Sequence, residues 1–164
     1  MKNVLTAATI SAIALIATPL AAQNVQVGEP IVVSSNMTLD QWAEIVSQDL
    51  AEQLDRMSTL PLRDQPNGVV QVRFTCDEDG KPANIAVYRS SGEHGIERLG
   101  KRAVKRLKAL HPMPEVAKNG QPFLANIVFA DSYEQERELF AKLADMETER
   151  LASNGEARTY IALK

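Results

Sequence analysis

Residues 68–92 read GVVQVRFTCDEDGKPANIAVYRSSG, residues 96–114 read IERLGKRAVKRLKALHPMP, and residues 121–130 read QPFLANIVFA. In the first stretch, apolar and polar residues alternate on both sides of Asp77–Lys81, which predicts two β-strands joined by a turn. Gly80 suits a turn position with positive φ, and so short a connection predicts an antiparallel hairpin. The last stretch alternates in the same way and predicts a third strand, Phe123–Phe129, beside the hairpin.

The first of these strands is expected to bury one face only. Its apolar side chains are Val70, Val72, Phe74 and Cys76, and its polar side chains are Gln71, Arg73 and Thr75. Because successive side chains of a strand point to opposite faces, the polar set is expected on the solvent side.

A basic amphipathic helix is expected between the hairpin and the third strand, from about Ile96 to Leu110. Its apolar stripe consists of Ile96, Leu99, Ala103, Leu107 and Leu110. The other faces carry lysines and arginines without interleaved aromatic residues, so we interpret them as solvated and expect no nucleic-acid binding. Pro112 and Pro114 close the helix.

A preceding helix is expected to begin at Thr38. Thr38 and Gln41 have the spacing of a capping box, and Met37 and Trp42 occupy the positions of a hydrophobic staple. The apolar stripe that follows comprises Leu39, Trp42, Val46, Leu50, Leu54 and Met57. The helix should end before Leu60-Pro61, since a residue that precedes proline is disfavoured in the helical conformation.

Residues 38–132, with their core at 68–130, are therefore expected to form one α+β domain. Its small antiparallel sheet, the hairpin plus the third strand, packs against helices. Residues 133–164 are expected to add a C-terminal helix, Tyr133–Leu151, and a tail in which Ala157–Leu163 forms a short strand.

Residues 1–22 have the plan of a secretory signal peptide, with Lys2 near the start, an apolar Ala-rich run, and Pro19 and small residues before Gln23. Cleavage after Ala22 would leave an exported protein with an extended lead-in at 23–37. The alternative is an uncleaved membrane anchor, although threonines, a serine and Pro19 dilute the apolar run. The full chain has a net charge of −3, which favours neither nucleic acid nor an anionic membrane as its partner.

No catalytic, cofactor-binding or metal-binding constellation is expected. Cys76 is the only cysteine of the sequence, so no internal disulfide forms, and we interpret it as a buried, unreactive thiol without a base beside it. His94 and His111 lie at opposite ends of the basic helix, about 20 Å apart, which is too far to share a metal through it. The acidic run Asp77–Asp79 lacks the spacing of an EF-hand loop, so we interpret it as a solvated turn.

These elements, in this order, resemble the C-terminal domain of TonB, the energy transducer of Gram-negative envelopes. The resemblance rests on Gly68-Val69-Val70, Asp79-Gly80, Ser90-Ser91-Gly92, the exit Pro112-x-Pro114 and the closing Ile127-Val128-Phe129. It implies recognition rather than catalysis, because domains of this family capture an extended segment, the TonB box, from the plug of an outer-membrane transporter. The segment is added as a strand to the exposed edge of the sheet, where main-chain hydrogen bonds supply affinity.

The edge that the resemblance implies here consists of Phe123, Leu124, Ala125, Asn126, Ile127, Val128 and Phe129. We therefore expect a periplasmic binding module linked to TonB-dependent transport, whose partner is an outer-membrane TonB-dependent receptor or another envelope protein. The alternative is a structural or self-association domain, with the edge covered by Ala157–Leu163 or by a second copy in a homodimer, since exposed edges are usually covered. No enzyme activity, cofactor or small-molecule substrate is expected.

Full-length transducers that resemble this family carry two features that residues 1–37 of this sequence do not show. At the offset of their Ser-x-x-x-His motif, Ser11 is followed by Leu15, and residues 23–37 contain one proline, Pro30, in place of a Pro-rich spacer. We therefore expect an adaptor, a competitor or a regulator rather than a complete transducer. A retained membrane anchor would restore the transducer role.

Overall fold

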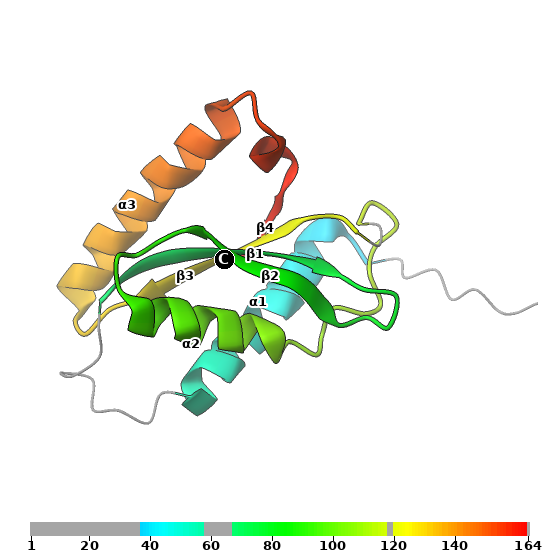
Figure 1. The fold of residues 1–164 in the computed structure, drawn as a ribbon, viewed down its shortest axis with the longest axis horizontal. Coiled ribbons are helices and arrows are strands. Elements are labelled where there is room, and N and C mark those ends of the chain that lie inside the picture. The colour runs from blue at the N-terminus through cyan, green and yellow to red at the C-terminus, as the bar shows by residue number, and fades with distance from the viewer. Residues whose placement is uncertain (1–36, 58–66, 118–119, 164) are drawn as a thin grey trace, which may run out of the picture. The chain divides into compact units, whose positions relative to one another are not determined.

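The computed structural model describes residues 37–57, 67–117 and 120–163 (Figure 1). The expected signal peptide and almost all of the lead-in lie outside the described residues. The elements along the described chain are α1 (Leu39–Met57), β1 (Gly68–Cys76), β2 (Pro82–Arg89), α2 (His94–Lys105), β3 (Phe123–Phe129), α3 (Tyr133–Ala152), the 3₁₀-helix η2 (Glu156–Thr159) and β4 (Ile161–Leu163). Within these ranges, every helix is too short or too polar to cross a membrane.

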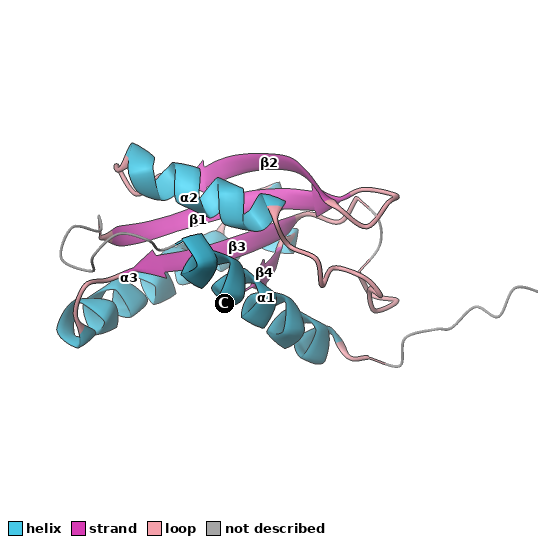
Figure 2. Cartoon of the chain, turned by 90° about the horizontal axis from the view of Figure 1, so that it is seen from below, coloured by secondary structure: helices cyan, strands magenta, loops and turns pink. Residues whose placement is uncertain are grey.

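The strands form one sheet in the order β2-β1-β3-β4 (Figure 2). β1 is antiparallel to β2, which confirms the predicted hairpin, and it is antiparallel to β3 on its other side. Gly80 adopts φ +78° in the hairpin turn, and its N–H donates to the carbonyl of Asp77. β4 lies parallel to β3, so the tail adds a fourth strand and the sheet is mixed rather than purely antiparallel. The α+β fold class is confirmed.

α1 and α2 cover one face of the sheet, and the main apolar core lies between these helices and the strands. The largest fully buried side chains include Trp42, Phe74, Phe123, Ile96, Leu110 and Leu163. The ring centroid of Trp42 lies 5.1 Å from that of Phe123, and the indole Nε1–H donates to the carbonyl of Leu110 at 3.1 Å. Trp42 thereby joins α1 to β3 and to the loop that follows α2.

α1 begins as its sequence predicts. The N–H of Thr38 donates to Oε1 of Gln41 at 3.0 Å, and the N–H of Gln41 donates to Oγ1 of Thr38 at 3.2 Å. These reciprocal bonds form the expected capping box, which satisfies donors that a helix start would otherwise leave unpaired. The helix ends at Met57, before Leu60-Pro61 as expected.

α2 is shorter than predicted, because it ends at Lys105 and not near Leu110. The N–H groups of Lys108 and Ala109 leave the helical pattern and donate to Oδ2 of Asp49 in α1, at 2.6 and 3.0 Å. Leu110 is still fully buried, since the loop runs beside α1 and delivers it to the core. The last apolar residues of the predicted stripe, Leu107 and Leu110, are therefore buried by a loop and not by the helix.

The face of α2 that contacts the sheet differs from the expected one at positions 99 and 100. Leu99 is only half-buried, whereas Gly100 is buried against the sheet. A Cβ atom at position 100 would lie 3.2 Å from Cγ1 of Val70 and 3.3 Å from Cδ1 of Ile127. The absence of a side chain at this position lets α2 approach the strands closely.

Asp49→Ala is expected to lower the free energy of unfolding by about 1–2 kcal/mol near neutral pH, because two main-chain donors lose a charged acceptor. The pKa of Asp49 lies below its usual 3.8. Partial burial acts to raise this pKa, but hydrogen bonds from Lys108, Gln53 and Ala109 and the charge of Lys108 outweigh the effect of burial.

A carboxyl group whose pKa is lowered by folding stabilises the protein fully above its unfolded pKa of about 3.9, and this stabilisation is lost as the pH falls through the folded pKa. Denaturant unfolding of wild type and Asp49→Ala, followed from about pH 7 to about pH 3, should therefore show the difference shrinking toward the acid end. Asp55→Ala, at an exposed position of the same helix, is the matched control. A pH-independent difference would contradict the role of the ionised carboxylate.

α3 covers the opposite face of the sheet (Figure 1). Val69, Leu143 and Met146 form a second, smaller apolar cluster there. This packing corrects the expectation that β1 buries one face only, since Gln71 is fully buried and only Arg73 of the polar set is exposed. α3 covers the second face of β1.

Candidate functional site

The outer edge of β3, for which a docking role is expected, is divided by the structure into two halves. β4 pairs with the first three residues of β3, Phe123–Ala125. Among the described residues, no strand pairs with the remainder of that edge, Asn126–Phe129. The expected tail strand, Ala157–Leu163, is present only as β4, Ile161–Leu163, because residues 156–159 form the 3₁₀-helix η2. Among the described residues, the β3 edge is therefore paired in its first half and without a strand partner, or open, in its second half, although Asn126 and Ile127 there are buried.

A groove of about 710 Å³ lies along the open half of the edge. Asn126, Ile127 and Val128 line it from β3, while α1 and α3 form its two walls. The walls are mostly apolar and include Leu50, Leu54, Phe140, Leu143, Ala144 and Leu151. Phe140 and Leu151 remain 51% and 52% exposed, so apolar surface is accessible at the mouth of the groove.

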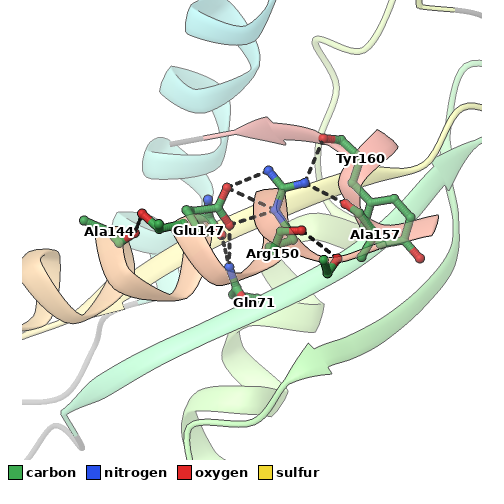
Figure 3. Close-up of polar contacts among 9 residues, drawn as sticks. Gln71, Ala144, Glu147, Arg150, Ala157 and Tyr160 are labelled. Carbon is green, nitrogen blue, oxygen red and sulfur yellow. Dashed lines mark hydrogen bonds and ion pairs between the residues drawn. The ribbon is translucent and has the colours of Figure 1, made fainter. Parts of the chain in front are cut away.

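Polar side chains from three elements meet beneath α3 (Figure 3). Nε2 of Gln71 donates to Oδ1 of Asn126 at 2.8 Å and to Oε1 of Glu147 at 2.7 Å. Arg150 donates through Nη2 to Oε2 of Glu147 at 2.7 Å, and the two side chains are only 3% and 16% exposed. Removing one partner of so buried an ion pair is costly, because the other charge is left without compensation.

Arg150 also holds the C-terminal tail. Its Nη1 donates to the carbonyl oxygens of Ala157 and Tyr160, at 2.6 and 3.4 Å (Figure 3). The sequence alone did not indicate a role for Arg150. The one signal in the sequence is spacing, since Leu143, Met146 and Arg150 fall on the same side of a helix. The arginine therefore occupies a position of the buried stripe.

Two polar atoms of the side chains that meet beneath α3 have no hydrogen-bond partner among the described residues. Oε1 of Gln71 and Nδ2 of Asn126 are buried and have no partner among the described residues. Buried groups without partners cost free energy. Asn126 also lines the groove, so this unused hydrogen-bonding capacity lies directly beneath the open half of the edge.

Cys76 and the two histidines form no catalytic arrangement in the described part of the chain. Contrary to the expectation of a thiol without a base beside it, Sγ of Cys76 lies 3.3 Å from Nε2 of His111, in the loop after α2. Burial, followed by the charge of Asp77, raises the pKa of this thiol, which disfavours the nucleophilic thiolate. The His94 side chain is 95% exposed. Among the described residues, no three His, Cys, Asp or Glu side chains come together to hold a metal ion.

The sheet edge, the groove and the covering helices define a small protein-interaction domain. Residues 62–130 match the family model of the Gram-negative bacterial TonB protein C-terminal domain. The match supports the assignment of this part of the chain to the TonB C-terminal domain family, which indicates a TonB-like protein-interaction domain of the Gram-negative envelope. No curated protein and no solved structure matches the chain.

The matched range contains β1, β2, α2 and β3 and stops at residue 130. α1, one wall of the groove, precedes it, and α3 and β4 follow it. The open half of the β3 edge therefore belongs to the family domain, while both walls of the groove come from outside the match.

Proposed function

We propose that this protein is a periplasmic TonB-like binding module that captures an extended segment, similar to a TonB box, by adding it as a strand to β3. The segment belongs to an outer-membrane TonB-dependent transporter or to another envelope protein. The observation that supports this proposal most directly is the open edge Asn126–Phe129 beside the groove. Unpaired main-chain groups on a strand edge are a template for an added strand.

The chemistry of the groove suits an extended, uncharged segment. Its walls are mostly apolar, and its two charged lining residues, Glu147 and Arg150, pair with each other. A partner strand would gain main-chain hydrogen bonds from β3 and apolar contacts from both walls. A charged side chain in the groove would lose water without finding a free counter-charge.

A titration of the ¹⁵N-labelled protein with a synthetic TonB-box peptide tests the proposal. Amide shifts are expected to cluster on Asn126–Phe129 and on the groove walls. Ala144→Arg, at an exposed wall position, should weaken binding by at least about tenfold, because a long charged side chain obstructs the groove. Ala141→Arg, three residues earlier on α3 and outside the groove lining, is the matched control. Shifts that cluster elsewhere, or equal effects of the two variants, would contradict this binding mode.

The pairing of β4 with Phe123–Ala125 favours a second candidate, a structural or self-association domain whose edge is capped by the tail or by a second copy. This candidate predicts no response of the wild-type protein to the peptide. Sedimentation of the same sample distinguishes a capped monomer from a dimer.

The proposal includes export through residues 1–22, with the inner membrane as the location if they are not removed. N-terminal sequencing of the exported protein decides between release and retention. A mature chain that still begins at Met1 would contradict release.

A further inference from the structure

We propose that the C-terminal tail is a removable cap on the docking edge: β4 occupies the first half of β3 in the place of a partner strand. It must leave before a partner can pair along the whole of β3. The inference concerns the regulation of the docking edge and rests on the function proposed above. The cap is defined here as residues 153–163.

β4 reaches β3 from outside the family domain. The family match ends at residue 130, and the strands within it have the order β2-β1-β3, so β3 would be the outer strand without the cap. β4 pairs with Phe123–Ala125, and its residue Ala162 lines the groove that begins at Asn126. The cap and the groove therefore follow one another along a single strand edge. While β4 is in place, a partner strand can pair only with Asn126–Phe129.

The side chains of Arg150 and Ser153 tie the cap to α3. Arg150 donates to the carbonyl oxygens of Ala157 and Tyr160, and the same guanidinium donates to the carboxylate of Glu147. Ser153, the first residue of the cap, donates its Oγ–H back to the carbonyl of Arg150 at 2.7 Å. Arg150 thus acts as a latch between the helix and the segment that carries β4.

The cap has further attachments to the rest of the domain. Nε2 of Gln121 donates to the carbonyl of Thr159 at 3.0 Å. The N–H of Ile161 donates to the carbonyl of Pro122 at 3.2 Å, and the ring of Tyr160 meets that of Tyr88 edge-on at 5.8 Å. Of the described cap residues, Leu163 alone is fully buried. A three-residue strand with one buried anchor opens locally more readily than the long central strands, β1 and β3.

A competing cap lowers the affinity of the edge for any partner strand. The apparent dissociation constant equals the intrinsic constant divided by the fraction of molecules in which the edge is free. If the cap is released in about a tenth of the molecules, opening it fully should tighten binding about tenfold. The cap would therefore select for partners that pair along the full length of β3.

Two variants of the full chain open the cap by different means. Ile161→Pro removes the hydrogen bond to Pro122, and Tyr160 already has φ −67° and ψ 133°, which a following proline accepts. The double variant Glu147→Gln/Arg150→Met removes the latch without leaving a buried charge unpaired.

The matched control removes a different ion pair of α3. Arg89→Gln/Glu149→Gln abolishes the contact between Arg89 Nη1 and Glu149 Oε2 at 3.1 Å, which does not touch β4. Two synthetic peptides serve as probes, a TonB-box peptide and a peptide with the sequence of residues 157–163 of this chain. Affinities are measured by calorimetry, and the exposure of β4 is measured by amide hydrogen exchange.

The expected result is that both peptides bind the two opened variants about tenfold more tightly than wild type or the control. The amides of β4 should also exchange faster than those of β1, and faster still when the TonB-box peptide is added. If the TonB-box peptide binds all four proteins equally, the cap does not compete, and the inference is overturned while the docking function stands.

A different set of results would contradict the proposed docking function. If the peptide of residues 157–163 binds only the opened variants and the TonB-box peptide binds none, the cap is upheld and the proposed partner class is wrong. If neither peptide binds any variant, both proposals are overturned.

Discussion

Trp42→Ala is expected to lower the free energy of unfolding by about 3–5 kcal/mol, the range typical of large aromatic residues removed from a core. Trp42 has no exposed surface, and it packs against Phe123 in β3. Its indole N–H also donates to the carbonyl of Leu110, which lies in the loop where the sequence predicted the end of α2. The substitution therefore loosens α1 from the sheet and from that loop together. In thermal unfolding the midpoint should fall by about 10 °C or more.

Trp42→Phe separates the two contributions. A phenyl ring keeps most of the apolar contact but leaves the carbonyl of Leu110 without its donor, so the expected loss is about 1–2 kcal/mol. Ile45→Ala, at a position of the same helix that is 45% exposed, is the control and should change stability little. Denaturant unfolding near neutral pH measures all three variants. A loss below about 1 kcal/mol for Trp42→Ala would contradict the central position of this side chain.

Arg150→Met is expected to lower the free energy of unfolding by about 3 kcal/mol, at the low end of the range for breaking a buried ion pair. The aliphatic part of the side chain is kept, but Glu147 loses its cation while its own side chain is only 16% exposed. The lower end applies because Glu147 lines the groove and still accepts a hydrogen bond from Gln71. The carbonyl oxygens of Ala157 and Tyr160 also lose their donor.

The double variant Glu147→Gln/Arg150→Met should recover most of this loss, because no uncompensated charge remains beneath α3. Arg56→Met, which breaks an exposed pair with Glu52, should cost less than about 1 kcal/mol. Urea unfolding with a common slope provides the comparison. A double variant as unstable as Arg150→Met would indicate that the links to Ala157 and Tyr160, and not the buried charge, dominate.

These two side chains stabilise different parts of the candidate site. Trp42 fixes α1, which forms one wall of the groove, and Arg150 holds both the other wall and the tail that carries β4. Under the proposed function, a stable position of both walls would keep the edge Asn126–Phe129 accessible to an added strand. α3 lines the groove and also holds the tail through Arg150, so it takes part in both proposals.

The sequence by itself determined the elements and most of their limits. The capping box of Thr38 and Gln41, the turn at Gly80 and the alternation of Phe123–Phe129 are all present in the structure. These signals act between residues a few positions apart, through main-chain hydrogen bonding, allowed φ values and the repeat of a helix or strand. The order of the elements was also enough to indicate the TonB C-terminal domain family.

Only the tertiary structure decided which surfaces are covered. Gln71 is buried because α3 lies over it, α2 ends early because Asp49 offers an acceptor 59 positions away, and half of the β3 edge is occupied by β4. An alternating strand has the same pattern whether its polar face meets water or a helix with matching polar groups. Contacts between distant segments depend on how the layers pack, and no local period or propensity encodes them.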